Sequence, residues 1–162
     1  MKEYKERAGL SPVQLTYGAL GLVGGVWMIL APFVLNYDAI TVLNTTTKKQ
    51  VSAELGPVTT NDIICGVLLI ALVGFALLTA NNAAMSKFRL YAGIATIGVG
   101  LYLMAAPYLF DLLKVAEYLS INKPNTNDVL IGLLTVIIAG FAVQHEFVPA
   151  QPKTTTNVSS AV

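Results

Sequence analysis

Two Asn-Asp pairs are the residues of this chain best suited to chemistry. Asn61-Asp62 and Asn127-Asp128 each follow a threonine, and each pair stands just before a long apolar run. Carboxyl and amide groups gathered at a membrane can bind an ion or a proton. The same residue types also cap helix N-termini, because their side chains accept hydrogen bonds from free backbone N–H groups. The sequence leaves both interpretations open, and caps need no ligand.

The other reactive side chains are few. The sequence holds one cysteine, Cys65, and one histidine, His145, which Glu146 follows. One cysteine cannot form an internal disulfide, and with a single histidine it cannot build a Cys/His metal site. The sequence has no phosphate-binding loop, dinucleotide-binding fingerprint or nucleophile elbow. We therefore expect no enzyme activity, no catalytic residue, no metal site and no cofactor.

Composition indicates a chain surrounded by membrane lipid. Hydrophobic residues make up 55% of the 162 residues, and charged residues only 12%. Soluble domains carry about 25% charged residues because their surface must be hydrated. The formal net charge of +1 also argues against a nucleic-acid partner, since nucleic-acid binders need a basic face to neutralise phosphates.

Four apolar segments are long enough to cross a membrane as helices. A hydrocarbon core of about 30 Å needs about 20 apolar helical residues. The predicted spans are residues 15–35, 63–79, 90–110 and 129–147. On these bounds we expect no buried acidic or basic side chain in the spans, and such charges are the usual mark of ion pathways. The predicted fold class is an all-α membrane protein with four transmembrane helices.

The connecting segments are polar. Residues 36–60 form an extended loop, in which β-branched residues on both sides of a polar turn predict a small β-hairpin outside the bilayer. Residues 111–119 place apolar side chains on one helical face, which is typical of a helix lying in the membrane interface. Residues 1–14 are predicted to be a cytoplasmic N-terminal segment, and residues 149–162 a disordered tail.

The chain repeats itself. Residues 15–80 and 81–148 each form a two-helix hairpin, and two spans return the chain to its starting side, so the copies have parallel orientations. Corresponding positions of the two copies hold identical or similar residues. The pairs are Gly25 with Gly100, Trp27 with Tyr102, Pro32 with Pro107, Asn61-Asp62 with Asn127-Asp128, Gly66 with Gly132, and Gly74 with Gly140.

Each copy carries a small residue, a proline and an aromatic residue late in its first helix. These motifs are Ala31-Pro32-Phe33 and Ala106-Pro107-Tyr108. A duplicated two-helix unit with this motif resembles the SPW-repeat family of prokaryotic integral membrane proteins, which is named for Ser-Pro-Trp at that place. The resemblance covers residues 15–148 and implies the architecture. The family has no established activity to carry over to residues of this chain.

The two prolines interrupt helical hydrogen bonding. Pro32 and Pro107 lack a backbone N–H and crowd the carbonyl group four residues earlier. We expect a kink or a helix end near the membrane interface, with Phe33 and Tyr108 in the belt of aromatic residues. A hinge or a binding notch is the alternative.

Glycines mark the predicted packing faces. Gly21 and Gly25 form a GxxxG motif in the first span, and Gly93 and Gly100 lie in the third. Small residues let transmembrane helices approach closely. We expect these glycines to join spans one and three or to bind a partner subunit. The predicted function is accordingly an accessory or scaffold subunit, which packs against other membrane-protein subunits or self-associates.

Two other functions stay open. A small transporter or channel subunit would use the Asn-Asp pairs as polar gates, and replacing Asn61 and Asn127 with alanine would then abolish flux. A lipid or pigment binder would use Trp27 and Tyr102. Lysine and arginine are more numerous on the side of the two termini. By the positive-inside rule, this bias predicts a multi-pass protein of a prokaryotic cell membrane with both termini cytoplasmic.

Overall fold

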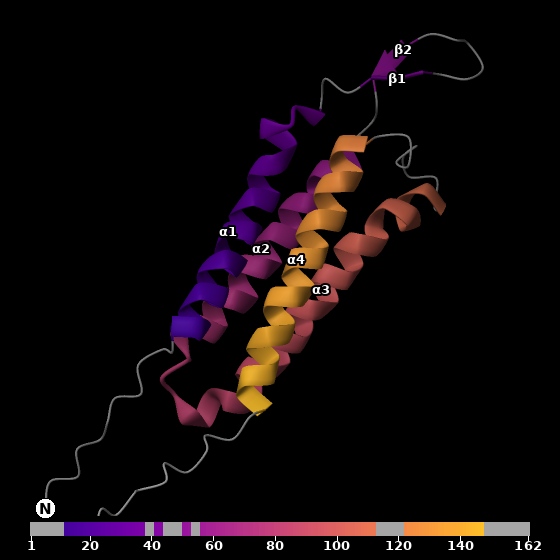
Figure 1. The fold of residues 1–162 in the computed structure, drawn as a ribbon. Coiled ribbons are helices and arrows are strands. Elements are labelled where there is room, and N and C mark those ends of the chain that lie inside the picture. The colour runs from indigo at the N-terminus through magenta and orange to yellow at the C-terminus, as the bar shows by residue number, and fades with distance from the viewer. Residues whose placement is uncertain (1–11, 38–40, 44–49, 53–55, 113–121, 148–162) are drawn as a thin grey trace, which may run out of the picture.

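The part of the chain that the structure describes folds into four long α-helices and two short strands. The structure is a computed structural model, and it describes residues 12–37, 41–43, 50–52, 56–112 and 122–147. The helices are α1 (Pro12–Val34), α2 (Gly56–Leu78), α3 (Ser86–Leu112) and α4 (Asn122–Phe147), with a short 3-10 helix, η2 (Ala83–Met85), before α3. They run alternately up and down, so α1 begins and α4 ends at the same end of the bundle (Figure 1).

All four helices of the described residues are long and apolar enough to cross a membrane. The candidate spans are Gln14–Val34, Gly56–Leu78, Ser86–Phe110 and Pro124–Gln144. Large apolar side chains such as Val23, Leu78 and Tyr91 lie on the outer surface of the bundle. A helix that is apolar on its outer face as well as its inner face is suited to lipid rather than water. The prediction of an all-α, multi-pass membrane protein is confirmed.

Glycines bring the two helices of each hairpin into backbone contact. A Cβ atom built on Gly66 of α2 would lie 2.6 Å from the carbonyl oxygen of Gly25 in α1. A Cβ atom on Gly132 of α4 would lie 2.6 Å from the carbonyl oxygen of Gly100 in α3. No side chain fits at such distances. The same close approach therefore occurs once in each hairpin.

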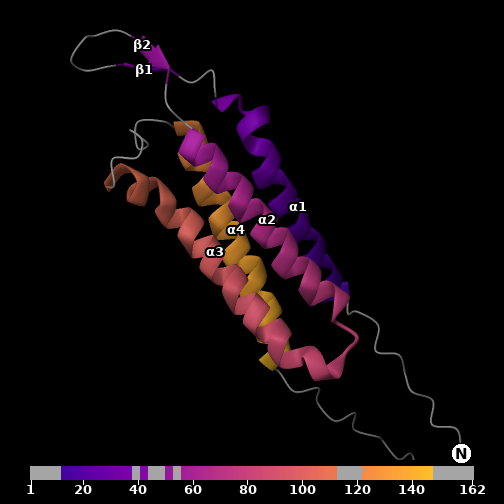
Figure 2. The same ribbon diagram turned by 180° about the vertical axis from the view of Figure 1, so that it is seen from behind.

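The glycines serve contacts within the hairpins. Gly21 of α1 faces Val73 of α2, and Gly93 of α3 faces Val143 of α4. The prediction that these glycines join spans one and three is wrong, because they face the second helix of their own hairpin. The two hairpins meet where α2 packs on α3 and α1 packs on α4. Figure 2 shows α2 and α3 side by side from behind.

The second helix of each hairpin begins earlier than the sequence predicts. The helix α2 begins at Gly56 rather than residue 63, and α4 begins at Asn122 rather than residue 129. Each has a proline in its first turn, Pro57 or Pro124. Proline suits that turn because its fixed φ is helical and its missing N–H would have no partner there. Because of these extra turns, both Asn-Asp pairs lie within the helices rather than before them.

The end of α1 turns the chain back over the bundle. Asn36 adopts the left-handed conformation, with φ of 54°, as asparagine often does just after a helix. The backbone N–H of Leu35 still donates to the carbonyl of Ala31 at 2.8 Å. As a result, Tyr37 is buried, with 1% of its surface exposed.

A small antiparallel hairpin follows, as predicted. Strand β1 (Thr41–Leu43) pairs with β2 (Gln50–Ser52), and Val42 lies opposite Val51. Figure 1 shows the strands beyond the end of the bundle where α1 ends.

Parts of several other predictions lie outside the described residues. They are residues 1–11 of the N-terminal segment, 113–121 with most of the predicted interfacial helix, and the predicted tail 149–162.

The two motif prolines lie inside helices. Pro32 is in the last turn of α1 and Pro107 is in α3, and both are buried. Their aromatic neighbours Phe33 and Tyr108 are exposed on the outer surface.

Candidate functional site

The early helix starts bring two carboxyl groups into the centre of the bundle. Asp62 of α2 and Asp128 of α4 are both 0% exposed, and the two groups interact electrostatically. The expectation that the spans hold no buried acidic side chain is therefore wrong. The cap interpretation also fails for Asp62 and Asp128, because α2 and α4 begin six residues before them.

The amide groups of the two pairs connect the hairpins. Nε1 of Trp27 in α1 donates a hydrogen bond to Oδ1 of Asn127 in α4 at 2.8 Å. The hydroxyl of Tyr102 in α3 donates to Oδ1 of Asn61 in α2, also at 2.8 Å. Trp27 corresponds to Tyr102 in the sequence alignment, and Asn127 to Asn61. The same bond is thus made twice, each time from the first helix of one hairpin to the second helix of the other.

Tyr37 covers one of the two carboxyl groups. Its hydroxyl donates a hydrogen bond to Oδ2 of Asp62 at 3.1 Å. Burial raises the pKa of the Tyr37 hydroxyl, and the neighbouring Asp62 and Asp128 raise it further. The sequence analysis missed this residue, because it lies beyond the predicted first span and no motif marks it. The corresponding residue of the second copy is Leu112, which has no hydroxyl to donate.

Two polar atoms of the site are buried without a hydrogen bond. They are Oδ1 of Asp62 and Nδ2 of Asn61. An unsatisfied buried donor or acceptor costs about 1–3 kcal/mol, and such atoms are rare in native proteins unless they serve a function or hold water. Asn61 and Asp62 therefore each keep one buried polar atom available for a further hydrogen bond.

An apolar layer closes the site on the side facing the chain termini. It consists of Met28, Cys65, Leu69 and Leu103, with Val99 and Ile131 packed against them. Two of its sulfur atoms touch the amides above: Nδ2 of Asn127 donates to Sδ of Met28 at 3.6 Å, and Sγ of Cys65 lies 3.9 Å from Oδ1 of Asn61. We call these six residues the apolar layer.

The remaining candidates of the sequence lie away from this site. His145 and Glu146 fall in the last turns of α4, and their side chains lie outside the described part. Within the described residues, no three His, Cys, Asp or Glu side chains lie close enough to hold a metal ion together. Trp27 and Tyr102, the residues considered for a lipid or pigment, use their polar atoms on Asn127 and Asn61.

Replacing Tyr37 with phenylalanine is expected to change stability at alkaline pH. Because the pKa of Tyr37 is raised in the folded state, the tyrosine of the unfolded chain ionises first, near the ordinary tyrosine pKa of 10.0. Above pH 10 the wild type should therefore lose up to about 1.4 kcal/mol of stability per pH unit from this residue. Tyr37→Phe should lack that part of the slope. Unfolding by denaturing detergent at several pH values measures it.

The control is Tyr91→Phe, since Tyr91 lies exposed on α3. This variant leaves the hydrogen bond between Tyr37 and Asp62 in place. Parallel slopes for Tyr37→Phe and the wild type above pH 10 would show that Tyr37 is not held protonated by the site.

A family model described as the SPW repeat domain matches residues 16–142, a range that contains both Asn-Asp pairs and the aromatic residues bonded to them. No curated protein and no solved structure matches the chain.

Proposed function

The chain belongs to the SPW repeat family, and we propose that it is a non-enzymatic transport protein that carries protons at Asp62 and Asp128. The proposal starts from the finding that the described residues form four apolar helices able to cross a membrane. The observation that carries the proposal is the contact between two fully buried carboxyl groups inside membrane-spanning helices. Ionisable groups in that setting are costly and usually mark ion or proton pathways.

The chemistry of the pair suits a proton better than a fixed charge. Two ionised carboxylates side by side, shielded from water, repel each other strongly, so one of them retains a proton. Removing or adding one proton then switches the charge at the centre of the bundle. Proton-linked transport requires a group whose charge changes in this way when a proton binds or leaves.

We also propose that the two hairpins are internal repeats related by a pseudo-two-fold axis through the carboxyl pair. Two contacts support this arrangement because each occurs twice at corresponding positions: the glycine pairs within the hairpins and the aromatic-to-asparagine bonds between them. The interaction of Asp62 with Asp128 joins two corresponding residues. Tyr37 breaks the symmetry, because its hydroxyl bonds to Asp62 while the corresponding residue of the second copy, Leu112, has no hydroxyl. The two carboxyl groups are thereby made unequal, which favours a defined position for the proton.

Infrared difference spectroscopy of the purified protein between acid and alkaline pH tests the proton site. The wild type should show the carbonyl stretch of a protonated carboxyl group shielded from water, and this band should disappear as the pH rises. The band should be absent from the double variant Asp62→Asn/Asp128→Asn. Identical spectra for the wild type and the double variant would contradict the proposal.

An accessory or scaffold subunit is the second candidate. Gly21, Gly25, Gly93 and Gly100, on which it was based, face helices of their own hairpins. What favours it now is Gly74 of α2 and Gly140 of α4, which have no atom within 4 Å of an added Cβ and so leave room for another helix. Native mass measurement after mild solubilisation tests this function. A monodisperse monomer without a partner would count against it.

We place the protein in a prokaryotic cell membrane with both termini in the cytoplasm. The bias of lysine and arginine toward the terminal side of the spans supports this orientation. Protease digestion of a C-terminal tag in inverted and right-side-out vesicles measures it directly.

A further inference from the structure

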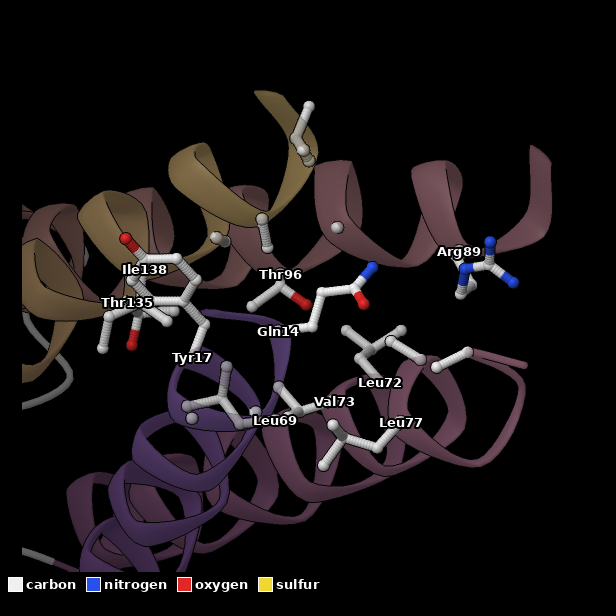
Figure 3. A pocket seen from close by; sticks show the side chains of 18 residues that line it. Gln14, Tyr17, Leu69, Leu72, Val73, Leu77, Arg89, Thr96, Thr135 and Ile138 are labelled. Carbon is white, nitrogen blue, oxygen red and sulfur yellow. The ribbon is translucent and has the colours of Figure 1, made fainter. Parts of the chain in front are cut away.

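A cavity opens between the helices at the end of the bundle where α1 begins and α4 ends. Its volume is about 90 Å³, and all four helices of the described part contribute to its wall. Figure 3 shows Leu72, Val73 and Leu77 of α2 along one side and Thr96 of α3 on another. Most of this wall is apolar, but it holds several hydrogen-bonding side chains: Gln14, Tyr17, Arg89, Thr96 and Thr135.

The cavity meets the requirements for holding water. Liquid water occupies about 30 Å³ per molecule, so the space admits about three molecules, and each needs two to four polar partners. Thr96 and Thr135 are buried and place hydroxyl groups on two neighbouring helices. The Thr96 hydroxyl donates to the carbonyl oxygen of Ala92 in its own helix at 2.8 Å, so toward the cavity it is an acceptor. Arg89 stands near the outer end, where Nη1 donates to the carbonyl oxygens of Thr79 and Asn82 at 2.7 and 2.8 Å.

The two copies of the hairpin differ at this cavity. Thr96 and Thr135 of the second copy correspond to Gly21 and Leu69 of the first copy. The second copy thus offers hydroxyl groups at two positions where the first copy has a glycine and a leucine. The helices of the first copy pack without a hydroxyl group at these positions.

The cavity ends at the apolar layer below the carboxyl pair. Leu69 belongs to both, because it lines the cavity and packs in the layer. It lies seven residues beyond Asp62 on α2, and Thr135 lies seven residues beyond Asp128 on α4. Two helical turns correspond to about 10 Å. The carboxyl pair and the cavity are therefore aligned along the bundle and separated by one layer of side chains.

We propose that this cavity is a water-filled half-channel connecting the proton site to the membrane face on which both termini lie, with the apolar layer as its gate. The inference rests on the proposed function, because it gives the Asp62–Asp128 pair an entrance. Tyr37, bonded to Asp62, closes the site on the opposite side. Protons then reach the pair from the terminal side when Leu69 and Leu103 part.

Cysteine labelling tests the water in the cavity. Cys65 is the only cysteine in the sequence, so Cys65→Ala gives a cysteine-free background. In that background Thr135→Cys should react with a charged, membrane-impermeant methanethiosulfonate added on the side of the termini, because the reactive thiolate forms only where water reaches it. The matched control is Ile137→Cys, which lies on the outer, lipid-facing surface of the same helix.

We expect Thr135→Cys to react at least about ten-fold faster than Ile137→Cys, since thiolate formation governs the rate. The reaction should be fast only from the terminal side, as comparison of inverted and right-side-out vesicles would reveal. Equal slow rates for the two variants, or faster labelling from the opposite side, would overturn the half-channel.

Native Cys65 reports on the gate. It lies in the apolar layer and is 3% exposed, so the wild type should not react from either side. Leu69→Ala, which shortens a side chain shared by cavity and layer, should make Cys65 reactive from the terminal side. Leu69→Val provides a milder change if the alanine variant does not fold. Unchanged protection of Cys65 in whichever variant folds would overturn the gate.

The labelling and infrared results separate the two proposals. Labelling of Thr135→Cys without a protonated-carboxyl band would support the water-filled cavity and overturn the proton site. A band without labelling would support the proton site and overturn the half-channel.

Discussion

Replacing Gly66 or Gly132 with alanine lowers the free energy of unfolding by about 1–3 kcal/mol, the usual range for overpacking a close contact. In each case the new Cβ would lie 2.6 Å from a backbone carbonyl oxygen of the partner helix. Backbone atoms cannot rotate away as a side chain can, so the two helices of the hairpin must separate. In lipid, packing contacts hold helices together, and separating them loses stability along the whole seam.

Gly74→Ala and Gly140→Ala are the matched controls for this prediction. They lie on the same two helices as Gly66 and Gly132, and nothing is found within 4 Å of an added Cβ. Alanine favours a helix over glycine by about 1 kcal/mol, so the control variants should be as stable as the wild type or more so. Denaturation in mixed micelles at high dilution measures all four. Equal losses in both pairs would contradict the prediction, because only Gly66 and Gly132 lie against a backbone carbonyl oxygen of another helix.

The number and nature of the helices follow from the sequence, but their starting points do not. A long apolar run indicates that a transmembrane span exists, because helix residues that face the hydrocarbon core must be apolar. It does not report polar residues that precede the run and still belong to the helix. Pro57 and Pro124 were the available signals, since proline favours the first helical turn. Reading them would have placed Asp62 and Asp128 inside the helices.

The partners of the glycines could not be read from their spacing. A motif such as Gly21 with Gly25 predicts close approach to some helix, and several helices of the bundle would satisfy it. The choice depends on which faces the loops bring together. In the structure the glycine faces lie within each hairpin, although the shortest connection joins α2 to α3.

The internal alignment carried more information than any single motif. It paired Trp27 with Tyr102 and Asn61 with Asn127, and the structure joins these residues in two crossed hydrogen bonds. Alignment reports which positions are equivalent, whereas the bonds depend on how the two hairpins dock. The position of Tyr37 depends on a single turn at Asn36. A local conformation of that kind leaves no periodic pattern in the sequence.

Liposomes containing the wild type dissipate an imposed pH gradient, and liposomes containing Asp62→Asn/Asp128→Asn do not. The reason is that asparagine keeps the shape and most hydrogen bonds of aspartate but cannot accept and release a proton near neutral pH. A dye enclosed in the liposomes reports internal pH, with a potassium diffusion potential to balance the charge. The double variant should match protein-free liposomes.

Two further variants distinguish proton transport by the carboxyl groups from a purely structural role of the polar side chains in the site. Asp128→Glu keeps a carboxyl group and should retain measurable flux. Asn61→Ala/Asn127→Ala removes both acceptors for the bonds between the hairpins and leaves the carboxyl groups in place. It should slow flux while the protonated-carboxyl band persists, because the amides orient the site and the aspartates carry the proton. Full flux in the Asp62→Asn/Asp128→Asn variant would exclude the pair as the proton carrier, whatever the infrared spectra show.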